Sequence, residues 1–269
     1  MTTISHAELL YLGDQNLAAF NCELTRWQED YEIVESDDLI MTVGADAFPA
    51  SNFVMRLGSD QRPEAVEMFD RLMAFYRQRR RGFNLYLRGH ADTDLERTCE
   101  DRGMIRIGSP PGMHLAAPLP DRRLKGDVTV RVAADREVMA DFAAVTVASY
   151  QSLGLPEDTG RRLFARPERM CKPYVIPVVA YDGGVPAAAA MAFLSHGIAG
   201  IYWVGTIETH RGRGLADQCT RLAGNRSFAM GARQVVLQAS PLGEPVYRAM
   251  GYREFTRYPW YMWFYREED

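Results

Sequence analysis

The chain has 269 residues, of which 47% are hydrophobic and 25% are charged, and its formal net charge at pH 7 is −4. A length of this order accommodates two compact domains. The mild negative charge argues against the basic class of nucleic-acid-binding proteins, and no apolar run predicts a membrane span or a signal peptide. Four cysteines without metal-ligand spacing predict free thiols, no metal site and a cytoplasmic location.

The first half of the chain predicts an α/β unit. A strand at 52–57 precedes an amphipathic helix at 63–79. A strand at 83–88 and a helix at 94–102, which ends at Gly103, come next. The turn at 58–63 has no second glycine, and it carries an acid where arginines cluster in the second half.

A Pro-led, charged segment without periodicity, residues 118–126, predicts a domain boundary. We therefore expect one domain at residues 1–122 and another at 127–269.

The second half alternates between the two-residue period of strands and the longer period of helices. In chain order we expect a strand at 128–132, a helix at 135–150, a polar Arg-rich helix at 156–170, strands at 174–181, 185–193 and 198–207, a helix from 215 to 230, a strand at 234–239, a short helix at 244–250 and an aromatic strand at 258–265. Asp182-Gly183-Gly184 predicts a hairpin turn.

Between the strand at 198–207 and the next helix lies the most informative segment. Gly212 and Gly214 let the backbone approach a ligand closely. A helix N-terminus leaves several N–H groups unpaired and places the positive end of the helix dipole there. With Arg211 and Arg213 beside them, these groups predict a phosphate or diphosphate site. The alternative is an ordinary strand–turn–helix connection.

Two common phosphate motifs do not fit this segment. A Walker loop needs Lys-Ser/Thr after its last glycine, where Leu215 and Ala216 stand. A Rossmann fingerprint needs a third glycine and an acid at the end of the next strand, and neither is present.

The arrangement Arg211-x-x-Gly214-x-Ala216 instead resembles the Arg/Gln-x-x-Gly-x-Gly/Ala signature of the GNAT (Gcn5-related) N-acetyltransferase superfamily. The resemblance implies that acetyl-CoA is the co-substrate and that the loop holds its pyrophosphate. The residues implied in that role are Arg211, Gly212, Arg213, Gly214, Leu215, Ala216 and Asp217. The order of elements from residue 127 to residue 269 is similar to the GNAT fold as well.

A second motif, Val246-Tyr247 followed by Gly251-Tyr252, resembles the last conserved GNAT segment. The resemblance implies that Tyr247 lies near the coenzyme sulfur and protonates the departing thiolate, and that Ser240 is the polar residue that precedes it. An aromatic side chain that only anchors a helix to the sheet is the alternative for Tyr247.

The resemblance also implies that the strand before the loop splays from its neighbour, so that the backbone at Val204, Gly205 and Thr206 binds the pantetheine arm and orients the thioester. A base or a water chain must neutralise the amine. Glu208 is the candidate base, although a structural role beside the loop arginines is slightly favoured for it. His196 and His210 are the other candidates, with solvent exposure and packing as their expected fates.

The first half resembles a degenerate copy of the second. Superposing Gly103 on Gly251 places Cys99 where Tyr247 stands, and the diphosphate loop is missing. The fold class is thus expected to be α/β with mixed sheets, as two tandem GNAT-like domains of which the first is non-catalytic. An unrelated α+β first domain is the alternative.

Taken together, the sequence predicts transfer of an acetyl group from acetyl-CoA to the primary amine of a small molecule or to a terminal amino group. A non-catalytic acyl-CoA-binding or assembly module is the alternative, and a hydroxyl or thiol acceptor stays open. The basic cluster at 161–172 either attracts an acidic acceptor or, as we favour, forms a solvated helix face. We expect no nucleic-acid or membrane partner, and a homodimer is possible.

Overall fold

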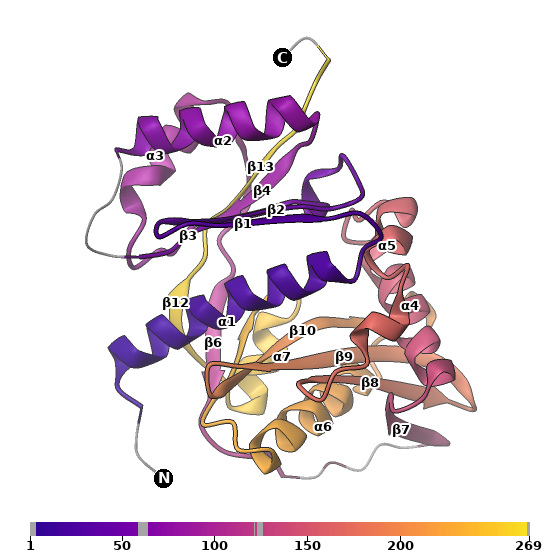
Figure 1. The fold of residues 1–269 in the computed structure, drawn as a ribbon. Coiled ribbons are helices and arrows are strands. Elements are labelled where there is room, and N and C mark those ends of the chain that lie inside the picture. The colour runs from indigo at the N-terminus through magenta and orange to yellow at the C-terminus, as the bar shows by residue number, and fades with distance from the viewer. Residues whose placement is uncertain (1–3, 59–63, 121, 123–125, 268–269) are drawn as a thin grey trace.

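Two mixed β-sheets lie one above the other, with a long helix between them (Figure 1). This arrangement comes from a computed structural model that describes residues 4–58, 64–120, 122 and 126–267. Most of the turn expected at 58–63, and residues 121 and 123–125 of the expected linker, lie outside the described residues.

The upper sheet in Figure 1 has six strands, in the order β1 (Glu32–Glu35), β2 (Leu39–Val43), β3 (Phe53–Arg56), β4 (Phe83–Tyr86), β13 (Trp260–Trp263) and β5 (Ile105–Gly108). Only β3 and β4 run parallel. Helices α2 (Ala65–Arg79) and α3 (Thr93–Asp101) cover its outer face through a shared apolar core.

The lower sheet has seven strands, in the order β12 (Arg253–Arg257), β6 (Pro111–Leu115), β11 (Val235–Gln238), β10 (Ile198–Thr206), β9 (Val185–Ser195), β8 (Val175–Asp182) and β7 (Val128–Val132). Its outer face packs against α6 (Leu215–Ala229) and α7 (Glu244–Met250), and its inner face packs against α4 (Arg136–Gln151). Gly183 and Gly184 both have positive φ in the hairpin between β8 and β9, as predicted.

The two sheets exchange one strand each. Strand β6, from the first half of the chain, lies between β11 and β12 of the lower sheet. Strand β13, at the C-terminal end, lies between β4 and β5 of the upper sheet. A division of the chain at residues 122–127 therefore separates the helices α2 and α3 from α4 to α7, but it does not separate the sheets.

The exchange follows a repeat in the order of elements. The run β3–α2–β4–α3–β5 has the same strand directions as β10–α6–β11–α7–β12, because β3 pairs parallel with β4 and β10 pairs parallel with β11. Gly103 and Gly251, which follow the two equivalent short helices, both have positive φ. The first half is thus built as a copy of the second.

Helix α1 (His6–Arg26), which the sequence analysis did not predict, fills the space between the sheets (Figure 1). Phe20 stacks on Tyr202 of β10 with 3.6 Å between ring centroids. Asn16 accepts a hydrogen bond of 2.7 Å from the Tyr202 hydroxyl, and its amide nitrogen donates to Ser195 Oγ at 2.8 Å. The interior of the protein therefore runs unbroken from one half to the other.

The expected helix at 156–170 is divided into α5 (Glu157–Leu163) and a short 3-10 turn at Pro167–Met170. Pro167 explains the break, because a proline disfavours the helical conformation at the residue before it. Arg166 accordingly has φ −123° and ψ 67°.

The basic side chains of this region are mostly exposed, and three of them also contact the first half of the chain. Arg162 binds Asp46 at 2.8 Å, Arg166 binds Glu29 at 2.8 Å, and Arg169 donates to the backbone carbonyl of Arg26 at 3.0 Å. These partners lie in the first half of the chain, so the cluster ties the two halves together. The exposed face favoured from the sequence is therefore present, and it also carries contacts between the two halves.

Candidate functional site

Strand β10 carries a β-bulge in the middle of the lower sheet. Its pairing with β9 shifts register between Tyr202 and Gly205, and Trp203 has a φ of 52°. On the other side, pairing with β11 ends at Ile201 and Leu237. A bulge bends its strand away from the regular ladder. The second half of β10 therefore leaves β11, which is the splay that the resemblance implies.

The splay turns two backbone positions toward the open side of β10. The Ile207 amide donates to the Ala187 carbonyl at 2.9 Å, so Ile207 and Gly205 face β9. Alternation along an antiparallel pair then directs the backbone groups of Val204 and Thr206 away from β9. The Thr206 carbonyl accepts a hydrogen bond of 3.3 Å from Arg211 Nε.

Gly205 has a packing role as well. A Cβ atom on this residue would stand 2.0 Å from Ser149 Oγ of α4. Only glycine lets α4 approach the strand this closely. We therefore correct the expectation for Gly205: its backbone faces β9 and its missing side chain admits the helix, whereas its neighbours face the splay.

The loop after β10 presents a row of free backbone amides. Gly212 and Gly214 have φ of 77° and 76°, in the left-handed region that glycine favours. Gly214 is the N-cap of α6 and supplies no side-chain cap, whereas Asp135 caps α4 by accepting from Val138 N. Within the part of the chain that the structure describes, the N–H groups of residues 212–217 donate to no protein acceptor.

The two loop arginines are engaged by the protein itself. Arg211 donates to Ser152 Oγ at 2.6 Å. Arg213 forms an ion pair with Asp182, which also accepts from His210 Nδ1 at 2.8 Å. Asp182 therefore fixes both ends of the loop. From the sequence, Asp182 is expected only as part of a hairpin turn, and no local pattern signals its contacts with the loop.

Asp217, in the first turn of α6, directs its side chain into the protein. Its carboxylate binds Arg221 Nε at 2.5 Å and also pairs with Arg122, and the residue is 6% exposed. Its contribution to an anion site is accordingly limited to its backbone amide.

Tyr247 lies on α7, buried against α6. Burial raises the pKa of the Tyr247 hydroxyl, the nearby Tyr150 and Tyr252 hydroxyls raise it further, and the Thr220 hydroxyl that faces it opposes the shift. The Tyr247 ring meets the Tyr252 ring edge-on, with centroids 5.6 Å apart. The hydroxyl is thus a neutral donor at physiological pH and a weaker acid than free tyrosine.

The other candidate residues, Glu208, Ser240 and His196, are exposed. The side chain of Glu208 is 82% exposed and stands 4.0 Å from Arg211, an arrangement that matches the structural role favoured from the sequence. Ser240 Oγ accepts from Gly243 N at 3.1 Å and so holds the turn before α7. His196 is exposed in the β9–β10 turn.

Tyr150, at the end of α4, is a residue that sequence reasoning missed. Burial raises the pKa of its hydroxyl, and the backbone of Val204 beside it opposes the shift. Its ring meets Trp203 edge-on at 4.9 Å. Tyr150 therefore stands at the bulge itself, within electrostatic range of Tyr247. The only signal in the sequence was its place at the end of a predicted helix.

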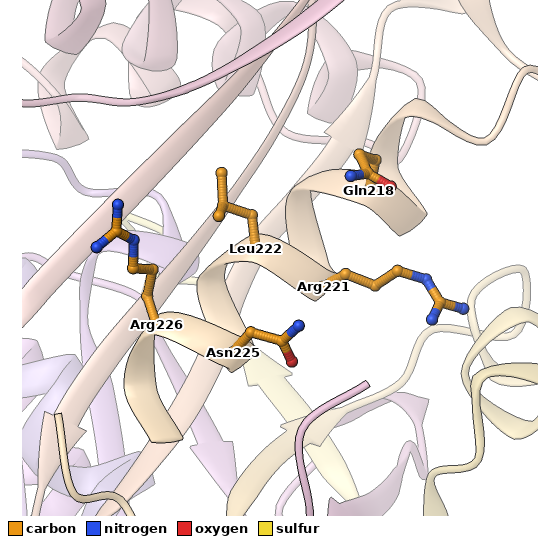
Figure 2. Close-up of a pocket in the computed structure, with 5 residues that line it drawn as sticks. All are labelled: Gln218, Arg221, Leu222, Asn225 and Arg226. Carbon is orange, nitrogen blue, oxygen red and sulfur yellow. The ribbon is translucent and has the colours of Figure 1, made fainter. Parts of the chain in front are cut away.

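Further along α6, a shallow cavity of about 190 Å³ opens on the outer face of the helix (Figure 2). It is lined by Gln218, Arg221, Leu222, Asn225 and Arg226. Asn225 exchanges hydrogen bonds of 2.8 Å with the backbone of Leu119, so the chain between the halves rests on this face. The cavity contains no nucleophile or acid.

Neither a metal site nor a membrane span is found among the described residues. No group of three or more His, Cys, Asp or Glu side chains there is placed to hold a metal ion. None of the described helices is both long enough and apolar enough to cross a membrane.

Comparison with known proteins gives a clear result at the level of structure. No family model and no curated protein matches the sequence. A GCN5-related N-acetyltransferase from Kribbella flavida has a similar structure, with a TM-score of 0.72, 19% identity and coverage of 93% of this chain and 95% of that one. One from Sphaerobacter thermophilus has a TM-score of 0.63, with 16% identity over 97% of this chain and 94% of that one.

The fold is therefore that of the GNAT N-acetyltransferases, and the predicted α/β class with mixed sheets is confirmed. It is the tandem form of that fold. A tandem GNAT protein from the clavulanic acid biosynthesis pathway matches with a TM-score of 0.55 and 14% identity over 86% of this chain and 79% of that one.

Proposed function

We propose that the protein transfers an acetyl group from acetyl-CoA to a primary amine of a small molecule or to a terminal amino group. One observation carries the proposal: the backbone amides of residues 212–217 have no protein acceptor and gather at the uncapped N-terminus of α6. Such a helix end favours a phosphate or diphosphate, since both the free N–H groups and the helix dipole attract negative charge.

The splay continues the site in a direction that suits the rest of the coenzyme. The pyrophosphate would bind residues 212–217, and the pantetheine arm would lie along the open side of β10. There the backbone of Val204 and Thr206 offers the amide and carbonyl groups that an extended amide chain pairs with. The Val204 amide, which lies beside the Tyr150 hydroxyl, would stabilise the negative charge that develops on the thioester oxygen.

The reaction is a direct displacement at the thioester carbon. The neutral amine nitrogen forms the new C–N bond, the C–S bond breaks, and the electron pair leaves with sulfur. The proton lost from nitrogen goes to solvent, since no buried carboxylate or imidazole of the candidate set lies at the bulge. Tyr247 would donate a hydrogen bond to the departing thiolate. Most of the rate gain would come from positioning the two substrates.

We also propose a cytoplasmic location. Three of the four cysteines, Cys22, Cys99 and Cys219, are buried and unpaired, which suits a reducing compartment such as the cytoplasm.

The experiment has two measurements. Calorimetry with CoA tests the amide row, and thiol release from acetyl-CoA over a panel of amines tests transfer. Binding with amine-dependent thiol release supports the enzyme. If CoA does not bind, the proposed acetyl transfer is refuted.

The second function is a coenzyme-binding module without turnover. It is favoured by one observation, that the Tyr247 hydroxyl faces Thr220 inside the protein and has a raised pKa. Tight CoA binding with no thiol release above the uncatalysed rate for any amine, hydroxyl or thiol would select this function.

A further inference from the structure

A threonine, a histidine and an aspartate are joined by hydrogen bonds beside helix α1. Asp14 comes from α1, His90 from the loop between β4 and α3, and Thr256 from β12, which contacts α1 (Figure 1). His90 Nδ1 lies 2.9 Å from Thr256 Oγ1, and His90 Nε2 lies 3.1 Å from Asp14 Oδ2. The three side chains therefore form one hydrogen-bonded chain that begins at a hydroxyl and ends at a carboxylate.

The aspartate decides which nitrogen of the imidazole carries the proton. Asp14 is 3% exposed, and its other oxygen accepts a hydrogen bond of 2.9 Å from the Tyr258 hydroxyl. Burial raises the pKa of Asp14, whereas His90, Arg88 and Tyr258 act against that rise by stabilising the carboxylate. A buried carboxylate requires donors, so His90 Nε2 carries a proton and donates it to Asp14. Nδ1 of the neutral imidazole is then an acceptor, and the Thr256 hydroxyl donates to it.

Two glycines bring the elements close enough for these contacts. A Cβ atom on Gly89 would stand 2.7 Å from the carbonyl oxygen of Arg257, the residue after Thr256. A Cβ atom on Gly112 would stand 3.0 Å from Thr256 Cγ2. Only glycine permits such an approach. The loop that carries His90 and the strand that carries Thr256 are therefore held together by backbone packing as well as by the hydrogen bond.

The hydroxyl end of the chain is open to solvent, whereas the carboxylate end is not. Thr256 is partly exposed on β12, which lies at the edge of the lower sheet. The side chain of His90 is 22% exposed and that of Asp14 is 5% exposed. The Arg257 carbonyl is a second acceptor for the hydroxyl at 3.5 Å, so the imidazole at 2.9 Å is the closer partner. A small molecule can therefore reach Thr256 Oγ1 from solvent.

A hydroxyl beside a base that a third group orients is the arrangement that activates serine and threonine nucleophiles. We propose that Thr256 is a nucleophile that accepts acyl groups from small, activated esters, with His90 as its base and Asp14 as the positioning residue. This site uses none of the residues 204–217 and needs no coenzyme. It is therefore independent of the proposed acetyl transfer.

The reaction consists of two displacements. Thr256 Oγ1 forms a bond to the carbonyl carbon of the ester, its proton passes to His90 Nδ1, and the leaving oxygen departs with the electron pair of the broken bond and takes that proton. A water molecule then gives a proton to His90 and attacks the acyl-threonine, and the proton and the electron pair return to Oγ1. Water is the second reactant. Because the carbonyl oxygen stays in solvent, we expect slower acylation than in an esterase with a preorganised oxyanion hole.

The test uses the full chain without CoA and p-nitrophenyl acetate as the ester. Release of p-nitrophenolate is followed, and peptide mass spectrometry after an acid quench locates the acetyl group. All proteins carry Cys171→Ser, because the exposed Cys171 thiol also reacts with such esters. We expect the acetyl group on Thr256. Thr256→Val keeps the shape of the side chain without the hydroxyl, so release should fall to the rate without protein and the acetyl group should be lost.

Thr129→Val is the matched control. Thr129 is an exposed threonine on β7, which is the opposite edge strand of the same sheet, and its contacts include no imidazole within the described residues. Its replacement should change neither the rate of release nor the acetylated residue. Equal rates for the two valine variants, or an acetyl group on residues other than Thr256, would overturn the proposal.

Two further variants test the base and its orientation. His90→Gln keeps a hydrogen-bonding side chain without a base, and acylation should slow about 100-fold. Asp14→Asn should slow acylation at least about tenfold with Thr256 still the acetylated residue, because the imidazole loses the group that fixes its tautomer. The chemical shifts of the His90 ring nitrogens in NMR report that tautomer, and they should change in Asp14→Asn but not in Thr129→Val.

The same NMR measurement decides the matter if a variant does not fold. In the unsubstituted protein, the His90 ring must carry its proton on Nε2 and leave Nδ1 free. A proton on Nδ1 of the neutral ring would overturn the proposal, because that nitrogen could not accept the proton of Thr256. Near-UV circular dichroism of each variant identifies those that retain the native packing, and only their rates are compared.

Discussion

Replacing Tyr247 by phenylalanine tests the proton donor with little change in shape. If the hydroxyl donates to the departing thiolate, its loss removes a hydrogen bond to a charged group, worth about 1.5–3 kcal/mol. At about 1.4 kcal/mol per tenfold, kcat should fall about 10- to 100-fold. The Kd of CoA should change less than about twofold, because the amide row at 212–217 is untouched.

Tyr252→Phe is the control for this experiment. Tyr252 is also buried, its ring contacts Tyr247, and its hydroxyl has no partner among the described residues. Removing that hydroxyl should leave kcat unchanged. Single-turnover thiol release measures both variants under one protocol. Equal kcat values for the two variants would refute the assignment of Tyr247.

The pH dependence of the rate follows from the burial of Tyr247. An ordinary tyrosine begins to ionise near its pKa of about 10. Because burial raises the pKa of Tyr247, its proton is retained as pH rises through that value. The rate should therefore show no loss from this group up to about pH 10. A decline between about pH 8 and 9 that Tyr247→Phe abolishes would contradict this reasoning.

Three other predictions address the loop, the upper sheet and the bulge. Arg213→Glu should weaken CoA binding about tenfold or more in calorimetry, whereas Arg97→Glu, the same charge change on exposed α3, should not. Asp92→Asn breaks a fully buried pair and should cost about 3–5 kcal/mol at pH 7 by urea unfolding. Because its arginine partners hold the Asp92 pKa low against the effect of burial, this cost should shrink as pH falls below about 4. Gly205→Ala should cost about 1–3 kcal/mol through the clash with Ser149 Oγ, and an unchanged urea midpoint would contradict the close approach of α4.

Much of the second half could be predicted because its signals are local. The strand, the two glycines and the helix at 198–230 follow one another directly, and their conformations depend on near neighbours. The hairpin at Asp182 and the C-terminal glycine of α7 are local in the same sense. The stacking of Tyr86 on Trp260 is not local, because the two residues lie far apart in the chain.

Helix α1 shows why the rest was missed. It packs on both sheets, and its buried residues include Asp14 and Asn16, which bind partners far away in sequence. A helix that is covered on several sides by both apolar and polar contacts has no single apolar face, so its sequence lacks the helical periodicity of hydrophobic residues. The positions of β6 and β13 in the sheets could not be predicted either, because each pairs with a strand that is far away in the sequence.

The reciprocal placement of β6 and β13 has a consequence for synthesis on the ribosome. A nascent chain emerges from its N-terminal end, and domains made early normally fold before the later ones. Here the six-stranded sheet has a gap between β4 and β5 until residues 260–263 leave the exit tunnel. The half that is synthesised earlier cannot complete its sheet before β13 is synthesised, so the two halves reach their final form together.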